Sequence, residues 1–339
     1  MNSIIIDTCF RKKTPYTPVW YMRQAGRYLP EYRKLKGDRN ILDIVKNAEF
    51  AAQITMLPVK KLNVDAAVLF ADIMVPLIGI GLELEIVENI GPVIKNPISS
   101  IEQIKKFRTL NPREDIPYLL KTISLLKNEL TVPIIGFSAA PFTLASYLIE
   151  GKPTRDFIKT KKFMYTNPVA WNLLMKKLSK LINTYINAQI NQGVSLIQLF
   201  DSWVGCLSES DYISYVLPFS KEVFDNIQNK KIPTIHFGTN TAGMLPAFSS
   251  VNCNVISVDW RMPIAKCWEI IGYKKGIQGN LDPILLLSDW NTIKKNVDII
   301  FDQIPRKKGF IFNLGHGVLP ETPVENLVKL TDYVHQKLI

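Results

Sequence analysis

Two arginines near the start of the chain have the type and spacing to bind an anion. Arg23 and Arg27 lie four residues apart in the stretch PVWYMRQAGRYLPEYR, residues 18–33. That spacing directs both side chains to the same side in a helix or an extended segment. Each guanidinium presents a planar fork of donors, so the pair suits a carboxylate or a phosphate, the alternative being surface positions or internal ion pairs. Gly26 between them indicates a shaped loop and favours the clamp.

Three further polar residues follow short apolar runs. Asp72 comes just after the run 65–71, and Ser202 and His316 follow two later runs. A carboxylate accepts several N–H donors at once, and a histidine titrates near neutral pH. The ordinary alternatives are a helix cap for Asp72 and a structural loop position for His316. Ser202 has no neighbouring base in the sequence, so we interpret it as a hydrogen-bond donor and not as a nucleophile.

The elements that must position these residues alternate between strands and helices. A helix is predicted over 168–190, with Asn167 as its cap and Pro168 at its first position. Alternation of this kind predicts a parallel sheet with right-handed crossovers, and here a (β/α)8 barrel. An eighth strand is left open, because 83–87 fits either that role or a hairpin with 91–94. The seven strand-length apolar runs, expected to be covered on both faces, are 65–71, 134–138, 195–200, 232–237, 255–259, 276–280 and 310–314.

Polar or small residues stand at or just past the C-terminal end of each run. In an α/β barrel that end carries the active-site loops, so the pattern predicts where the site lies without naming its chemistry. The residues in question are Asp72, Ser138, Asp201, Ser202, Gly238, Asp259, Asn280 and His316.

Composition excludes several classes of protein. The 339 residues are 47% hydrophobic with mean hydropathy +0.07, which excludes a disordered chain and a disulfide-stapled mini-domain. The net charge of +11 comes with evenly spread lysines, which favours a solvated surface over a nucleic-acid-binding face. Four cysteines without a CxxC pair indicate reduced thiols. The uncharged stretch 130–149 is interrupted by prolines, so we expect a strand and a helix start there, no membrane segment, and a cytoplasmic location.

Five blocks of sequence, in order, resemble the uroporphyrinogen decarboxylase family, and the similarity covers essentially the whole chain. The resemblance implies a distorted (β/α)8 barrel formed by a single domain over 1–339, with 18–33 as an arginine-bearing substrate loop, and a homodimer. In the second motif, Ala139 and Ala140 precede Pro141 where many relatives have a glycine. The blocks are PVWYMRQAGRYLPEYR (18–33), FADIMVP (70–76), GFSAAPFTLASYLIEG (136–151), QLFDSWVG (198–205) and NLGHGVLP (313–320).

The resemblance also implies an activity: decarboxylation, without cofactor or metal, of the four acetate side chains of uroporphyrinogen III. The product on the route to haem is coproporphyrinogen III. Asp72 and Arg23 match the family's catalytic positions, although the proton donor stays open between Arg23, His316 and water. The implied substrate-binding residues are Arg23, Gln24, Ala25, Gly26, Arg27, Asp72, Tyr147, Ser202 and His316.

A carboxylate at position 72 has a physical rationale among so many substrate carboxylates. A folded tetrapyrrole points its pyrrole N–H groups inward, and Asp72 is an acceptor that can take several of them. Protonating a pyrrole creates a cation that draws in the electrons of the departing CO2. A fixed negative charge in a dry pocket stabilises that cation more than the neutral ground state.

Three alternatives compete with this hypothesis. A zinc-dependent, corrinoid-type methyltransferase on the same scaffold needs a His-x-Cys pair, but this chain has His236, Phe237 and Gly238, which disfavours it. A basic nucleic-acid-binding module lacks a supporting motif. A non-catalytic porphyrin-binding homologue is disfavoured because this chain keeps the residues that match the family's site, namely Arg23, Arg27, Asp72 and Tyr147.

Overall fold

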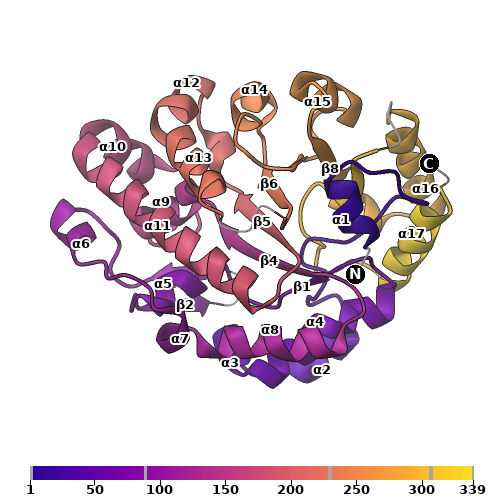
Figure 1. Cartoon of the computed structure of the whole chain (residues 1–339), viewed down its shortest axis with the longest axis horizontal. Helices are drawn as coiled ribbons and strands as arrows, with labels where there is room; N and C mark the ends of the chain where they lie inside the picture. Colours follow the sequence, from indigo (N-terminus) through magenta and orange to yellow (C-terminus); the bar gives the residue numbers. More distant parts are fainter. Residues whose placement is uncertain (1–2, 88–89, 228–230, 305–307, 338–339) are drawn as a thin grey trace.

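Seven parallel strands form the curled sheet at the centre of the fold, with helices around it (Figure 1). The computed structural model describes residues 3–87, 90–227, 231–304 and 308–337. All seven predicted runs are confirmed as strands. In sheet order they are β1 (Ala67–Val68), β4 (Ile134–Ala139), β5 (Leu196–Asp201), β6 (Thr234–Gly238), β7 (Val255–Ser257), β8 (Gly276–Leu281) and β9 (Phe310–Leu314).

The eighth position of the barrel is taken by residues 18–22. The amide of Phe312 in β9 donates to the Pro18 carbonyl, and the amide of Asp65, just before β1, donates to the Val19 carbonyl, each at 2.9 Å. This segment therefore joins the two edge strands of the sheet. The alternative assignment of 83–87 as the eighth strand is wrong.

That second segment forms a hairpin instead. Strand β2 (Leu84–Val87) pairs antiparallel with β3 (Gly91–Ile94), as the other interpretation of these residues predicted. Antiparallel partners close in sequence need only a short connection, whereas joining the parallel sheet requires a long crossover.

Helices separate the strands and cover the outside of the barrel (Figure 1). The longer ones are α4 (Ala48–Leu62), α8 (Pro117–Glu129), α9 (Pro141–Glu150), α10 (Ile158–Thr166), α11 (Pro168–Gln192), α13 (Leu217–Asp225), α15 (Ile264–Ile271), α16 (Trp290–Asp302) and α17 (Val324–Gln336). The shorter ones are α1 (Ile4–Cys9), α2 (Pro30–Lys36), α3 (Ile41–Lys46), α5 (Val75–Gly79), α6 (Ile101–Lys105), α7 (Pro112–Asp115), α12 (Glu209–Asp211) and α14 (Leu245–Phe248).

Helix α11 confirms the predicted helix over 168–190, with Pro168 in its first turn. The predicted cap is wrong in its chemistry. Asn167 occupies the capping position, but its side-chain amide donates to the Thr166 hydroxyl at 2.8 Å and caps no helical N–H. The uncharged stretch 130–149 likewise forms β4 and most of α9, as predicted. No helix in the described residues is both long and apolar enough to cross a membrane.

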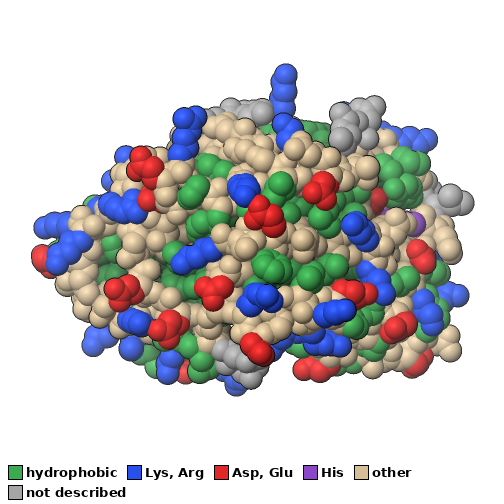
Figure 2. All heavy atoms as spheres, turned by 90° about the horizontal axis from the view of Figure 1, so that it is seen from below, with side chains coloured by type: hydrophobic (Ala, Val, Ile, Leu, Met, Phe, Trp, Pro, Cys, Tyr) green, Lys and Arg blue, Asp and Glu red, His purple; other side chains and the backbone are tan. Residues whose placement is uncertain are grey.

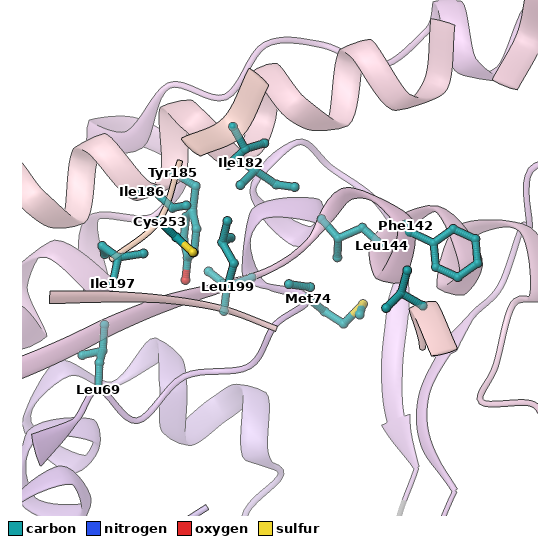
Figure 3. Packing of buried hydrophobic residues seen from close by; sticks show 14 of the residues in the cluster. Leu69, Met74, Phe142, Leu144, Ile182, Tyr185, Ile186, Ile197, Leu199 and Cys253 are labelled. Atoms are coloured by element: carbon teal, nitrogen blue, oxygen red, sulfur yellow. The ribbon is translucent and has the colours of Figure 1, made fainter. Parts of the chain in front are cut away.

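Strand residues alternate between two buried clusters, as a pleated sheet requires. Ile197 and Leu199 of β5 belong to the outer cluster with Ile182 and Tyr185 of α11, part of which Figure 3 shows. The inner cluster fills the base of the barrel with side chains from the sheet and from residues 18–22, which we call the closing segment. It includes Trp20, Ile135, Leu196, Ile235, Val255 and Ile311.

A buried polar layer lies above that apolar base. The Gln278 side-chain amide donates to Gln198 Oε1 at 3.0 Å and to Ser257 Oγ at 2.8 Å, and its oxygen accepts from the Trp20 indole N–H at 2.9 Å. Along β5 the inward-facing residues run Leu196, Gln198 and then Phe200. The polar layer therefore lies one inward residue below Phe200, toward the N-terminal end of the barrel.

Charged side chains of both signs are spread over the surface. On the face shown in Figure 2, lysines and arginines lie interspersed with aspartates and glutamates. This mixture agrees with the solvated surface expected from the even spacing of lysines in the sequence.

Candidate active site

A cavity of about 390 Å³ opens at the C-terminal ends of the strands, where the sequence predicted the site. Seven of the nine predicted substrate-binding residues line it: Arg23, Gln24, Ala25, Asp72, Tyr147, Ser202 and His316. The other lining residues are mostly apolar: Met22, Val68, Leu69, Phe70, Ala71, Ile73, Pro92, Phe137, Thr143, Phe200, Trp203, Phe237 and Gly317.

Arg23 reaches the cavity from the loop that follows the closing segment. Its φ of 61° is in the left-handed region, which a residue with a side chain adopts only when its surroundings enforce it. Its side chain lies across Gly317, where an added Cβ would overlap Arg23 Cδ and stand 2.7 Å from Arg23 Cγ. The glycine after His316 thus leaves the room that the guanidinium stem occupies.

Gln24 fixes this loop from beneath. Its side chain donates to the Ala66 carbonyl at 3.0 Å and accepts from the Tyr21 amide at 3.1 Å. Its own carbonyl accepts from the Tyr28 hydroxyl at 2.6 Å, and its amide donates to the Tyr21 carbonyl. Gln24 borders the cavity, yet these groups are already engaged within the protein, so it positions the residue before it.

Gly26 and Arg27 are absent from the described lining of the cavity. The Gly26 carbonyl accepts from the Leu29 amide, and the Arg27 carbonyl accepts from the Arg33 guanidinium at 2.7 Å. Regular backbone would direct the two arginines to one side, but the left-handed residue at position 23 changes the course of the chain. Arg33 holds the end of the loop, a role its spacing did not indicate.

Asp72 lies four residues beyond the last residue of β1. Its Oδ1 accepts from the Met74 amide at 2.8 Å and its carbonyl accepts from the Val75 amide, so it forms a turn just before α5. The alternative interpretation of Asp72 as a helix cap is wrong, because Met74 occupies the capping position of α5 and no side chain caps this helix. Burial raises the pKa of the carboxyl group, while the Met74 hydrogen bond and the charge of Arg23 oppose that rise.

His316 projects from between two glycines after β9, with its ring centroid 6.1 Å from that of Phe237. Burial lowers its pKa to about 4, Arg23 and Arg261 act in the same direction, and Asp259 opposes them. The expectation that this histidine titrates near neutrality is wrong, because two guanidiniums and desolvation disfavour the imidazolium. At neutral pH the ring is uncharged and offers one donor and one acceptor.

Tyr147 and Ser202 stand on the side of the cavity formed by α9 and the end of β5. The Tyr147 ring packs on Trp203 with centroids 3.8 Å apart, and Phe157 contacts the same indole at 5.2 Å. Burial and the nearby Asp72 raise the pKa of the Tyr147 hydroxyl, so it stays a neutral donor. The Ser202 carbonyl accepts from the Thr239 hydroxyl at 2.5 Å, which links β5 to the loop after β6.

The aromatic wall of the cavity escaped sequence reasoning. Phe200 packs edge-on against Phe137 and Phe237, with centroids 5.6 Å apart in each case. Each phenylalanine is an inward-facing residue near the C-terminal end of its strand. Bulky residues at inward positions in the C-terminal halves of neighbouring strands were the available signal, but strands buried on both faces are apolar throughout and hide it.

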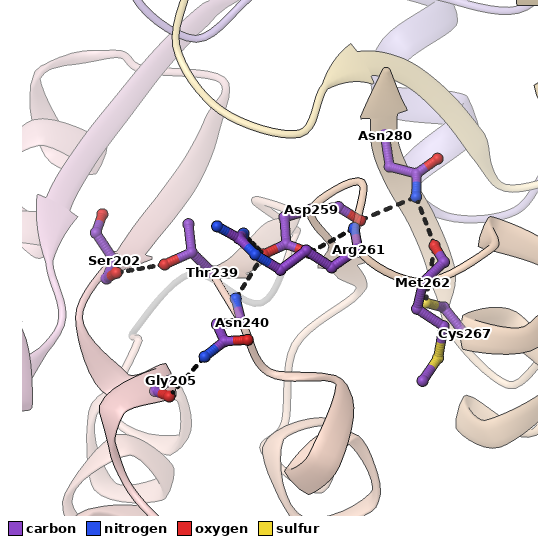
Figure 4. Close-up of polar contacts among 9 residues, drawn as sticks. All are labelled: Ser202, Gly205, Thr239, Asn240, Asp259, Arg261, Met262, Cys267 and Asn280. Carbon is purple, nitrogen blue, oxygen red and sulfur yellow. Dashed lines mark hydrogen bonds and ion pairs between the residues drawn. The ribbon is translucent and has the colours of Figure 1, made fainter. Parts of the chain in front are cut away.

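The other polar residues at the strand ends have structural roles. Asp201 accepts from the Thr143 hydroxyl at 3.1 Å, and Ser138 donates to the Ala139 carbonyl at 3.0 Å. The Asn280 side chain donates to the carbonyls of Asp259 and Met262, each at 2.9 Å (Figure 4). Ala140, at φ −75° and ψ 163°, is in ordinary extended backbone, so the missing glycine of the second motif imposes no strain.

The residues at the position of a His-x-Cys motif do not suit a metal. The His236 ring stacks on Phe248 at 3.9 Å between centroids, and an added Cβ at Gly238 would stand 2.7 Å from Thr241 and 2.8 Å from Phe248. A thiolate at position 238 would therefore need a rearranged loop. The described part of the chain contains no group of three or more histidine, cysteine or acidic side chains that could hold a metal ion.

Comparison with known proteins assigns a family. The family model described as uroporphyrinogen decarboxylase (URO-D) matches residues 1–337. Proteins named uroporphyrinogen decarboxylase from Carboxydothermus hydrogenoformans and Bacillus thuringiensis are 46% and 45% identical, each alignment covering 99% of this chain and 97% of the relative.

A solved structure confirms the fold. A methyltransferase from Methanosarcina mazei superposes with a TM-score of 0.80 over 98% of both chains, at 18% identity, which supports the barrel fold alone. Full-length sequence similarity, the matching family model and the cavity residues agree, and the chain belongs to the uroporphyrinogen decarboxylase family.

Proposed function

We propose that this enzyme removes CO2 from the four acetate side chains of uroporphyrinogen III and releases coproporphyrinogen III. The observation that carries the proposal is the placing of Asp72: it is the one carboxylate among the described lining residues, in a mostly apolar cavity that also holds the Arg23 guanidinium. Full-length similarity to relatives named uroporphyrinogen decarboxylase supports the same substrate.

In this proposal, different residues bind the pyrrole rings of the substrate and the carboxylates at its edge. The aromatic wall of Phe137, Phe200 and Phe237 suits the apolar faces of the pyrroles, and Asp72 accepts inward-pointing pyrrole N–H groups through its carboxylate. Arg23 grips a substrate carboxylate with its guanidinium fork. The Ser202 and Tyr147 hydroxyls add neutral donors.

The reaction needs one proton and yields one CO2 for each acetate. A proton adds to the pyrrole, the bond between the acetate methylene and its carboxylate breaks, and the electron pair flows into the cationic ring. A proton then takes the place of CO2 on the methylene carbon, and the ring returns its extra proton. Asp72 stabilises the cationic ring, because its charge is fixed and burial weakens the competition from water.

His316 serves this cycle in its neutral form. With its pKa near 4, the imidazole is uncharged at neutral pH and cannot deliver the first proton as an imidazolium. We assign it a hydrogen bond to a substrate carboxylate or to the group that carries the proton. Arg23 is assigned the clamp, since a guanidinium is a poor acid.

The test is incubation of the purified protein with uroporphyrinogen III under reducing, anaerobic conditions, with products separated by carboxylate number. We expect species with seven, six and five carboxylates to precede the four-carboxylate product, and protein dialysed against EDTA to react at the same rate. Unchanged eight-carboxylate substrate would refute the proposal.

We further propose that the chain is one folding domain that works as a cytoplasmic homodimer, as the family resemblance implies. Sedimentation equilibrium should give about twice the chain mass of 38.6 kDa, and thermal unfolding should show a single transition.

A further inference from the structure

Cations are scarce where an acidic substrate would need them. Arg23 is the only lysine or arginine among the described residues that line the cavity, while uroporphyrinogen carries eight carboxylates. A carboxylate buried against apolar walls without a cation loses its hydration and gains nothing in return. Most of the substrate carboxylates must therefore lie at the mouth, and cations held there decide how the ring is seated.

Arg261 is not among the described residues that line the cavity, but its charge acts on the lining residue His316, and its side chain is held in a fixed position. It lies in the loop after β7, where its Nη1 donates to Asp259 Oδ2 at 2.5 Å and its own amide donates to Asp259 Oδ1 at 3.1 Å. Its guanidinium carbon is 4.5 Å from the centroid of the Trp260 ring. The Asp259 carboxylate and the Trp260 ring both hold the planar guanidinium in place. Less side-chain entropy is therefore lost when the arginine binds a ligand.

The surroundings of Arg261 connect it to both sides of the cavity mouth. Asp259 Oδ2 also accepts from the Asn240 amide at 2.5 Å, and the neighbouring Thr239 hydroxyl donates to the carbonyl of Ser202, a lining residue. Figure 4 shows the Arg261 side chain extending from its own loop toward this Thr239 and Ser202 side. On the other side, Asp259 and Trp260 pack against Gly315, where an added Cβ would be 2.7 Å from the indole.

The guanidinium keeps donors for a ligand. Among the described residues its recorded hydrogen bonds run to Asp259 through Nη1 alone, and the side chain is 45% exposed. Asp259 in turn is almost fully buried and already accepts three hydrogen bonds. The aspartate thus orients the arginine, and the half-exposed side chain of Arg261 leaves guanidinium N–H donors that no hydrogen bond within the described residues uses.

We infer that Arg261 is a second anion-binding arginine at this site, which grips one carboxylate of the tetrapyrrole at the cavity mouth. The inference rests on the proposed function and adds a residue that determines substrate affinity. The carboxylate belongs either to a propionate, which the product keeps, or to an acetate, which the reaction removes. A purely structural role, balancing the buried Asp259, would leave substrate affinity unchanged.

The test compares Arg261→Gln and Arg261→Lys with wild type in the anaerobic assay. We expect Arg261→Gln to raise KM for uroporphyrinogen about fivefold with little change in kcat, and Arg261→Lys to fall between, because ammonium keeps the charge but loses the fork. Arg108→Gln is the matched control: that arginine is 49% exposed and paired with Asp115 at 2.7 Å, away from the cavity. Its KM should equal that of wild type.

Inhibition by the product separates the two kinds of carboxylate. If Arg261 binds a propionate, Arg261→Gln weakens inhibition by coproporphyrinogen by the same factor as it raises KM. If it binds an acetate, product inhibition stays at the wild-type value while KM rises.

A variant with wild-type KM would overturn the inference, even if its melting temperature falls, since KM does not depend on the folded fraction. Failure of the proposed function is a different result, because the wild-type protein would then release no CO2.

Discussion

Two polar layers lie one above the other inside the barrel: a lower layer around Gln278, and an upper layer formed by the cavity residues Arg23, Asp72 and His316. The two layers differ in how many of their hydrogen-bonding groups are paired within the protein. In the lower layer, Gln278 bonds to Gln198, Ser257 and Trp20, and all four side chains are buried or nearly so. In the upper layer, Asp72 makes a single side-chain hydrogen bond within the described residues, and its pKa is raised by burial. Buried side chains that bond to one another contribute stability, although the Gln198 Nε2 atom has no partner among the described residues, whereas a carboxylate that faces a cavity is suited to the binding and catalysis proposed for Asp72.

The largest effect should follow from removing the charge in the upper layer. Asp72→Asn keeps the size and an acceptor oxygen but cannot stabilise a cationic pyrrole, so we expect kcat to fall about a thousandfold while some binding remains. Steady-state kinetics with uroporphyrinogen measures this loss. Asp201→Asn removes a buried strand-end carboxylate outside the lining and should cost far less activity. Wild-type turnover in Asp72→Asn would remove this residue from the mechanism.

The same variant should not lose stability. Because burial raises the pKa of Asp72, the folded protein holds its proton more readily than the unfolded chain does, so the ionised carboxylate opposes folding at neutral pH. The neutral amide lifts that penalty, and urea unfolding should give an equal or higher free energy of unfolding. A clear fall would show that the carboxylate is a structural group.

The lower layer should respond in the opposite way. Gln278→Leu leaves the Trp20 indole N–H and Gln198 without their partner, so we expect about 3 kcal/mol lower stability in urea unfolding. KM should stay near the wild-type value in the fraction that is folded. Gln53→Leu, at an exposed position of α4, serves as the control and should change stability by less than about 0.5 kcal/mol.

The support of Arg23 can be weakened without touching the polar groups themselves. Gly317→Ala places a Cβ against the Arg23 side chain, so the guanidinium must move and kcat/KM should fall about thirtyfold. Gly243→Ala adds the same methyl group where nothing lies within 4 Å of it, and it should behave as wild type. Equal kcat/KM in the two variants would mean that the position of Arg23 does not matter.

The fold was predictable where one local pattern sufficed. Strands such as 134–139 and 196–201 are buried on both faces and therefore appear as uninterrupted apolar runs. The closing segment 18–22 was missed because its neighbours, β9 and the residues before β1, lie far away in the sequence. Its hydrogen bonds depend on tertiary structure, which no short window records.

Residue types and motifs were enough to select residues of the candidate site. They were not enough to predict the surroundings of each side chain, which set its pKa. Asp72, Arg23 and His316 lie in one cavity, as the family motifs implied. The pKa of His316 depends on burial and on Arg23 and Arg261, which belong to loops nearly three hundred and about fifty residues away. Burial in the folded cavity lowers this pKa most, and the charges of Arg23 and Arg261 add to the effect; the glycines beside the histidine in the sequence indicate neither.

The smallest expected effect concerns that histidine and tests the upper layer as a whole. If the imidazole is neutral above about pH 4, His316→Gln keeps a neutral donor and should lower kcat/KM only about fivefold, with an unchanged pH dependence between pH 6 and 8. Stability gives the second readout. The unfolded chain binds a proton near pH 6.5 and the folded protein only near pH 4, so wild-type stability should drop as pH falls through that window, and the variant should drop less. The contrary result would be a wild-type rate that changes with an ionisation near pH 6.5 and a His316→Gln variant without that change. It would show that the histidine in the cavity takes up protons as readily as a histidine in an exposed loop.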